Sequence, residues 1–174
     1  MIVTKRVLLA GAFLGLIAAP ASADSPTLLG TFKDWSAFQT VTGNSKVCYA
    51  MARPSASQPK KSKRDPISFL ISDWPGRRAK AELEIIPGYQ YKDGSDVTAQ
   101  VGTEKTTFFI RNEGGAGSAW VDDAGAEQHL VSAMAHGAKV VITGVSQRGT
   151  TTKDTYALDG LSSALDKIHA ACGM

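Results

Sequence analysis

Residues 67–86 read ISFLISDWPGRRAKAELEII and predict two β-strands separated by a turn. The first strand, Ile67–Trp74, is densely apolar and ends at Pro75-Gly76, residue types that interrupt regular structure. In the second, Ala81–Ile86, leucine and isoleucine alternate with two glutamates. This period of two is that of a strand with one buried and one solvated face. The stretch therefore predicts a β protein.

The same period continues on both sides of this stretch, with turn residues between short runs. Further strands are predicted over residues 31–41, 46–52, 96–101, 105–111, 118–122, 139–147 and 152–158. Helical spacing occurs in Ala126–His136 and in Leu161–Ala171, and the polar segment Pro54–Pro66 predicts a surface loop. The pattern predicts a mainly β sandwich or barrel of about eight strands, with two short helices of which the last is C-terminal.

The first residues have the three parts of a secretory signal peptide. Lys5-Arg6 supplies the positive start, Val7–Ala19 is an apolar run of 13 residues, and Ala21-Ser22-Ala23 is a small-residue cleavage site. A membrane anchor is the alternative, but crossing a bilayer takes roughly 20 apolar residues. The domain boundaries expected are 1–23 for a cleavable signal peptide and 24–174 for a single exported domain. We expect a periplasmic protein without a transmembrane segment in its mature chain, with association with the outer membrane or secretion as further destinations.

Charge limits the choice of partner. The chain has 19 Lys and Arg and 16 Asp and Glu residues, and cleavage of the leader would leave 17 against 16. A nearly neutral exported protein is not expected to bind nucleic acid. Basic residues gather in the loop at Lys60, Lys61, Lys63 and Arg64. Outside the cytoplasm, this cluster predicts contact with an anionic lipid or glycan, and a solvated loop with no partner is the alternative.

Cys48 and Cys172 are the two cysteines of the chain. In an oxidising compartment, an even pair predicts a disulfide, here one that would pin the last helix onto the sheet. Two buried free thiols are the alternative. A zinc site is not expected, because the close-spaced ligand pairs of such sites are missing.

The sequence lacks a recognisable catalytic, cofactor-binding or metal-binding pattern. His129 and His136 have no acidic or cysteine neighbour at metal-ligand spacing, and His169 lies in the last predicted helix beside Ala170, so surface or capping roles are expected for all three. Gly144–Gly149 reads G-x-S-x-x-G, one residue longer than a nucleophile elbow, and no predicted helix follows it. Gly114–Gly117 is not followed by the Lys-Ser/Thr or the helix that a phosphate-binding loop needs. These observations favour a protein that is not an enzyme and has no cofactor.

Several short segments resemble the invasion-associated locus B family of exported bacterial proteins. They are Gly30–Trp35, Val47–Ala50, Ile67–Ile71, Gly88–Ser95, Asp154–Leu165 and the final Cys172. The resemblance extends over nearly the whole predicted mature chain, and the Lys60–Arg64 cluster is not part of it. It implies an immunoglobulin-like β-sandwich, export to the periplasm or envelope and, in pathogenic relatives, a link to host-cell invasion. It transfers no catalytic residue.

Two functions of different classes are compatible with these sequence features. The first is a non-enzymatic envelope protein that binds an unknown protein or envelope component. The second is a periplasmic carrier of a small molecule or lipid, since β-sandwiches and barrels can hold apolar ligands between their sheets.

Overall fold

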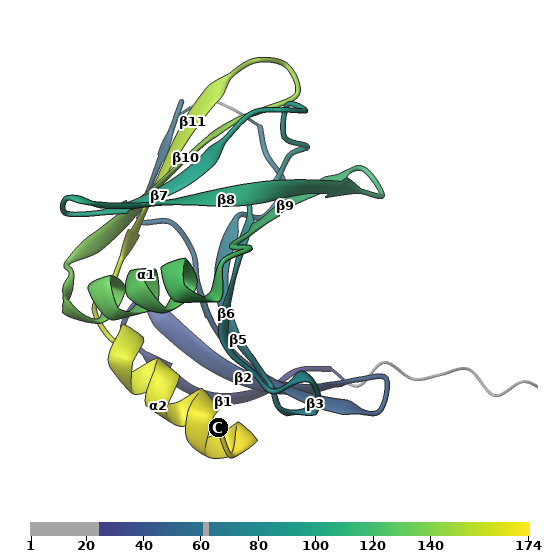
Figure 1. Ribbon diagram of the computed structural model, residues 1–174, viewed down its shortest axis with the longest axis vertical. Coiled ribbons are helices and arrows are strands. Elements are labelled where there is room, and N and C mark those ends of the chain that lie inside the picture. Colours follow the sequence, from purple (N-terminus) through teal and green to yellow (C-terminus); the bar gives the residue numbers. More distant parts are fainter. Residues whose placement is uncertain (1–24, 61–62) are drawn as a thin grey trace, which may run out of the picture.

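The computed structural model describes residues 25–60 and 63–174 (Figure 1). The predicted signal peptide and Lys61 of the basic cluster lie outside the described residues.

The described residues form one antiparallel sheet of eleven strands, in the order β1-β2-β3-β5-β6-β9-β8-β7-β10-β11-β4. The strands are β1 (Thr27–Phe32), β2 (Trp35–Thr42), β3 (Ser45–Ala52), β4 (Ala56–Gln58), β5 (Ser68–Trp74), β6 (Ala79–Ile86), β7 (Val97–Val101), β8 (Glu104–Glu113), β9 (Ala116–Trp120), β10 (Lys139–Val145) and β11 (Thr151–Ala157). The helices are the 3₁₀ turn η1 (Pro75–Arg77), α1 (Ala124–His136) and α2 (Leu161–Cys172).

The long strand β8 joins the two layers of the fold. Its first half pairs with β7, from Val101 opposite Glu104 to Val97 opposite Phe108. Its second half pairs with β9, beginning with Phe109 opposite Trp120. Because one strand belongs to both layers, the sheet curls into a sandwich-like fold without a break in its hydrogen bonding (Figure 1).

Large aromatic side chains fill the space between the layers. Trp35 and Phe69 lie with their ring centroids 6.1 Å apart, and Phe69 meets Tyr156 edge-on at 5.5 Å. The indole nitrogen of Trp35 donates to the carbonyl of Ala157 at 3.0 Å. The three rings are fully buried, so β2, β5 and β11 share one core.

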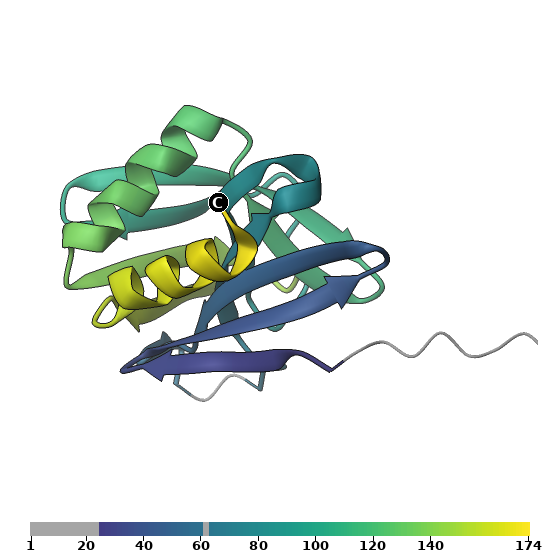
Figure 2. The same ribbon diagram turned by 90° about the horizontal axis from the view of Figure 1, so that it is seen from below.

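The two helices cover the inner side of the sheet (Figure 2). Helix α1 begins at Asp123, whose side chain accepts from the backbone N–H of Ala126 at 2.6 Å, the usual role of an N-cap aspartate. Helix α2 packs on β1, β2, β3 and β5. A disulfide joins its Cys172 to Cys48 of β3, with the Cα atoms 5.9 Å apart. The predicted pairing of the two cysteines is therefore present in the structure.

The expected mainly β sandwich with a C-terminal last helix is confirmed, although it has more strands than the expected eight. The single strand predicted over 31–41 is in fact the β1–β2 hairpin, whose turn holds Lys33 at a φ of +52° without a glycine or proline to signal it. The predicted loop Pro54–Pro66 contains β4, which lies against the edge of β11 with Ser57 opposite Asp154. A three-residue edge strand carries too little pattern to be recognised without its partner.

Candidate functional site

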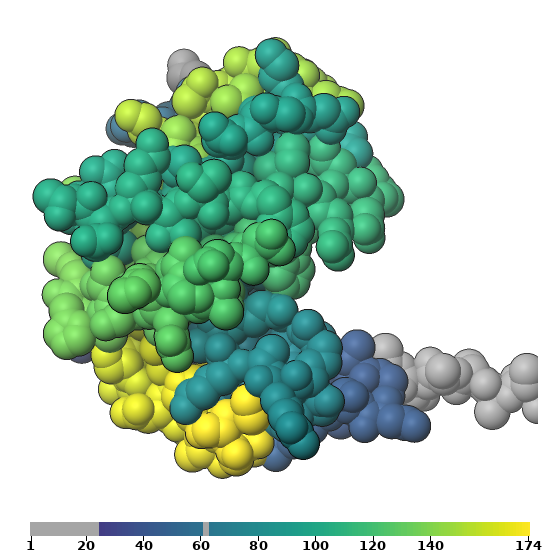
Figure 3. Space-filling view, in the orientation of Figure 1, coloured from purple at the N-terminus to yellow at the C-terminus, as the bar shows by residue number. Residues whose placement is uncertain are grey.

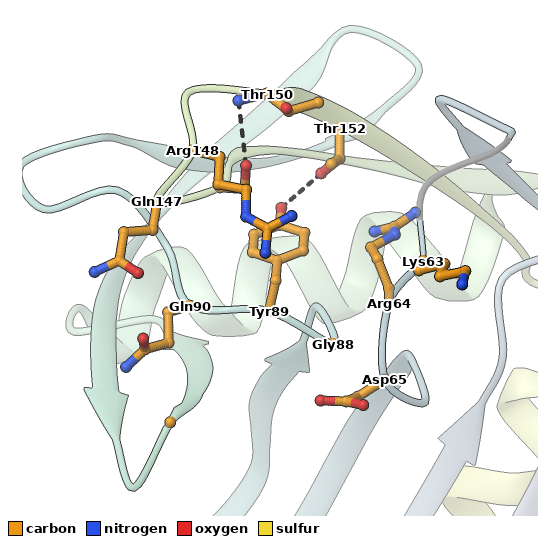
Figure 4. A pocket seen from close by; sticks show the side chains of 12 residues that line it. Lys63, Arg64, Asp65, Gly88, Tyr89, Gln90, Gln147, Arg148, Thr150 and Thr152 are labelled. Carbon is orange, nitrogen blue, oxygen red and sulfur yellow. Dashed lines mark hydrogen bonds between the residues drawn. The ribbon is translucent and has the colours of Figure 1, made fainter.

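An open cleft of about 730 Å³ lies where the segment after β4 meets the turn between β10 and β11 (Figure 4). Its lining residues are mostly of polar types and come from four separate parts of the chain: residues 63–65, residues 88–90, Gly115 and residues 146–152. The lining includes the side chains of Lys63, Arg64, Tyr89, Arg148 and Thr152.

Backbone contacts hold three of these parts together. The N–H of Asp65 donates to the carbonyl of Gly88 at 3.0 Å, and the N–H of Gln147 donates to the carbonyl of Gln90 at 2.8 Å. Gly88 has a φ of +73°, and a Cβ there would overlap the backbone of Asp65. Glycine therefore allows both this turn and the close approach of the two segments.

A buried ion pair forms one wall of the cleft. The guanidinium of Arg64 donates two hydrogen bonds to the carboxylate of Asp154, at 2.6 and 2.8 Å. Each side chain is only 5% exposed, and the guanidinium lies 5.7 Å from the centre of the Tyr89 ring. The hydrogen bond to Asp154 raises the pKa of Arg64 further. Such bidentate pairs fix geometry while they neutralise charge.

Arg64 is therefore not a free cation, and the prediction that it contacts an external anion needs correction. Sequence reasoning grouped it with its lysine neighbours, but the partner that neutralises it lies on the distant strand β11. Lys60 is exposed beyond the end of β4, and Lys63 is exposed at the cleft.

Tyr89 is a lining residue whose hydroxyl lies 2.6 Å from Oγ1 of Thr152. The hydroxyl of Thr152 also lies 3.5 Å from the carbonyl of Gly144, so Thr152 connects Tyr89 to β10. Burial raises the pKa of Tyr89 and keeps it neutral. Burial also raises the pKa values of Tyr91 and Tyr156, whose buried hydroxyls have no hydrogen-bond partner within the described part of the chain.

The cleft brings together two free cations that are far apart in sequence. Lys63 and Arg148 are both exposed in its lining, and neither forms an ion pair with any residue in the described ranges. Figure 4 shows Arg148 and Lys63 on different sides of Tyr89, with Asp65 as a nearby acid. Sequence reasoning missed Arg148, because only the packing of the β10–β11 turn against the other segments places it here.

The polar groups of the lining are hydroxyls, amides, two free cations and a carboxylate. The hydroxyl of Ser146 accepts from the backbone N–H of Thr150 at 3.2 Å. No histidine or cysteine is among the described residues that line the cleft. Within residues 25–60 and 63–174, no group of three metal-ligating side chains gathers anywhere. Two cations with several amide and hydroxyl donors are a set that recognises an anion.

The histidines have structural contacts. Nδ1 of His136 lies 2.8 Å from the carbonyl of Ser132 on the same helix. His169 pairs with the fully buried Asp73, with Nδ1 2.6 Å from a carboxylate oxygen. The other carboxylate oxygen of Asp73 accepts from the N–H of Ala81 at 2.9 Å. This pair ties α2 to β5 and β6, an arrangement that sequence spacing did not indicate.

The chain is similar to a known protein family and to a solved structure. The model of the family described as "Invasion associated locus B (IalB) protein" matches residues 35–169, most of the chain. The crystal structure of invasion associated protein B from Bartonella henselae is similar, with a TM-score of 0.59 and 17% sequence identity over 83% of this chain and 98% of that chain. At that identity, the likeness concerns the fold alone. No curated protein sequence matches the chain. The match of the family model over residues 35–169 shows that the chain belongs to the invasion associated locus B family.

Proposed function

We propose that this protein is an exported, non-enzymatic envelope protein that binds an anionic group of its partner in the cleft between Lys63 and Arg148. The family description supports a role associated with invasion. The disulfide is consistent with a location outside the cytoplasm. The signal sequence supports cleavage after Ala23, release of residues 24–174 as one domain, and residence in the periplasm or at the envelope. None of the helices in the described ranges could span a membrane.

The observation that carries this proposal is the pair of free cations at a rigid, neutral wall. The Arg64–Asp154 pair is already satisfied and cannot compensate the charges of Lys63 and Arg148. The Arg64–Asp154 pair still fixes the position of the segment that carries Lys63, because Arg64 directly follows Lys63 in the chain. Ordering a cation before the ligand arrives reduces the entropy lost on binding.

The alternative of a carrier has less support from the core. A ligand held between the layers would need space where Trp35, Phe69 and Tyr156 pack against one another. The cleft is open and only about half of its lining surface is apolar, unlike the largely apolar pockets that hold lipids or drug-sized molecules.

Removing both cleft cations tests the proposal. We expect a Lys63→Gln, Arg148→Gln double variant to bind immobilised heparin or phosphatidylglycerol vesicles about tenfold more weakly than the wild type at low salt. The two probes separate a glycan from a lipid as the source of the anion. Affinity is measured by surface plasmon resonance for heparin and by vesicle co-sedimentation for the lipid.

The matched control removes the same charge elsewhere. Lys105 and Lys139 are exposed and lie outside the cleft lining, so Lys105→Gln, Lys139→Gln keeps the cleft intact. If both double variants lose the same affinity, binding follows net charge and the cleft is not the site. Equal binding by wild type and cleft variant would also contradict the proposal.

A further inference from the structure

The side of the sheet opposite the helices carries a group of half-buried apolar side chains. The tips of the β2–β3 and β8–β9 hairpins reach out on this side, and Figure 3 shows a hollow between them. Cα register places these side chains on one face, because partners directly opposite each other across antiparallel strands point the same way. The aromatic face is defined as Phe38, Tyr49, Met51, Leu70, Phe109 and Trp120.

The register carries one row of this face across five strands, and Phe38 on β2 extends the face to a sixth. Met51 lies opposite Leu70, Leu70 opposite Glu84, and Glu84 opposite Trp120. Trp120 in turn lies opposite Phe109, whose side chain is 41% exposed. At roughly 4.8 Å between strands, the six strands from β2 to β8 span about 24 Å.

The aromatic face is separate from the hydrophobic core. None of its six residues belongs to the set of fully buried core side chains. Phe38 and Tyr49 stack on each other with ring centroids 5.2 Å apart, yet both remain partly open to solvent. A contiguous exposed apolar patch on a monomer commonly marks an interaction surface.

Glu84 lies in the middle of this face and has no cationic partner among the described residues. The neighbouring acids differ from it. Glu82 accepts two hydrogen bonds from Arg77, at 2.7 and 3.2 Å, and Glu113 lies 3.8 Å from Arg111. Burial, together with the charge of Glu82, raises the pKa of Glu84 to about 7. Its carboxylate is therefore partly desolvated and uncompensated, which a cation would correct.

We propose that the aromatic face docks a partner polypeptide through a lysine or arginine side chain that pairs with Glu84, while flanking apolar side chains of that partner cover the aromatic face. Charge complementarity indicates a cationic side chain on the partner, because Glu84 is the acid in the middle of the aromatic face and has no cationic partner among the described residues. Trp120 adds a ring face that attracts a cation or its aliphatic stem, whereas the Phe109 ring already has the guanidinium of Arg111 5.9 Å from its centre and offers apolar contact. The length of the face indicates a polypeptide partner. About 24 Å corresponds to roughly seven extended residues and is longer than a small amine could cover.

This site differs in place and sign from the anion-binding cleft. The cleft is lined by the segment after β4, residues 88–90, Gly115 and the β10–β11 turn, whereas the aromatic face lies on β2, β3, β5, β6, β8 and β9. Failure of one proposal therefore leaves the other standing.

An array of synthetic heptapeptides tests the proposal on the mature protein. The central position is lysine, arginine, glutamate or the uncharged norleucine, and the flanking positions vary among apolar residues. We expect the retained peptides to be enriched in central lysine or arginine. The tightest-binding lysine peptide is then titrated, with tryptophan fluorescence as the readout. We expect it to bind the Glu84→Gln variant at least about tenfold more weakly than the wild type, as is usual when a partly buried ion pair loses one partner.

Glu113→Gln is the matched control, because it removes an acid that is 79% exposed on β8, which β9 separates from the strand of Glu84. It is expected to keep the wild-type affinity. A second variant, Phe109→Ser, removes an exposed ring and is expected to weaken lysine and norleucine peptides alike. Affinity for the lysine peptide is also expected to rise between about pH 6 and pH 8 in the wild type only, as Glu84 loses its proton.

Several outcomes would overturn the proposal. One is an array without enrichment for a central cation, and another is equal binding of the lysine peptide to wild type and Glu84→Gln. Glu84-dependent dimers in sedimentation would assign the face to a second copy of this chain. Full competition by n-butylamine at the concentration of the peptide would assign it to a small cation.

Discussion

Glu84 shows how one unpaired side chain links stability to binding. Its carboxylate is half-buried beside Leu70 and Trp120, and the nearest charged neighbour in the strand, Glu82, is also an acid. The fold therefore favours the protonated form, with a pKa of about 7 against an ordinary value of 4.5. Sites that bind partners are often kept at such a cost to stability.

Replacing Glu84 by glutamine is expected to stabilise the free protein at alkaline pH. Between pH 4.5 and about 7, the folded state holds a proton that the unfolded state has lost, so the free energy of unfolding falls as pH rises through this window. Glu84→Gln removes this loss and should gain about 1 kcal/mol at pH 8, a value reduced for the solvent that still reaches the group. Urea denaturation of both proteins at about pH 4 and pH 8 measures the difference. A gain of the same size at both pH values would show that the carboxylate charge is not its cause.

At the scale of elements, the start of α2 depends on one close backbone approach. Gly160 precedes the helix with a φ of +89°, and a Cβ there would overlap the carbonyl of Phe32 at the end of β1. Beside it, the ammonium of Lys33 donates to the carboxylate of Asp159 at 2.7 Å. The β1–β2 turn and the start of α2 therefore form one contact, through which the C-terminal helix is positioned on the sheet.

Gly160→Ala is expected to destabilise the protein more than the same change at Gly149. Both glycines have positive φ, and at Gly149, with a φ of +81°, a Cβ meets nothing within 4 Å. The cost at Gly149 is expected to be about 1 kcal/mol, from backbone strain alone. At Gly160, the clash with Phe32 adds to this strain, for a total of about 3 kcal/mol. Thermal unfolding of the two variants compares them, and equal losses would mean that α2 moves freely away from β1.

At the scale of the whole molecule, the disulfide ties the last element to an early strand. Cys48 and Cys172 are separated by 124 positions, so the bond closes most of the described chain into a loop. The buried Asp73, paired with His169, lies opposite Cys48 in the register of β3 and β5. The disulfide and the contact between Asp73 and His169 therefore hold α2 on the sheet from neighbouring positions.

Reduction of the disulfide is expected to lower the free energy of unfolding by about 4 kcal/mol, from the entropy that the loop of the unfolded chain regains. Urea denaturation with and without a phosphine reductant measures the change. A Cys48→Ala, Cys172→Ala variant is the control and should not respond to reductant. Intact-mass measurement should show a gain of two hydrogens on reduction, and an unchanged mass would contradict the bond.

The amino-acid sequence was sufficient for those features that depend on local pattern. Alternation of apolar and polar residues located most of the strands, because one face of a strand packs against the core and the other faces water. Helical spacing located α1 and α2, and an even cysteine count indicated the disulfide. Strand β4 and the β1–β2 turn were not predicted, since a three-residue edge strand and a turn without glycine or proline have no recognisable sequence pattern.

The tertiary structure alone decided which charges are free. Lys63 and Arg64 are adjacent and chemically similar, yet Asp154 on β11 neutralises only Arg64. Arg148 faces the cleft because β10 and β11 bring their turn there. Glu82 and Glu84 look alike in the alternating strand, but Arg77 pairs with only one of them. Partners of this kind come from distant parts of the chain, so local sequence determines where a charge stands and three-dimensional packing determines whether it is available.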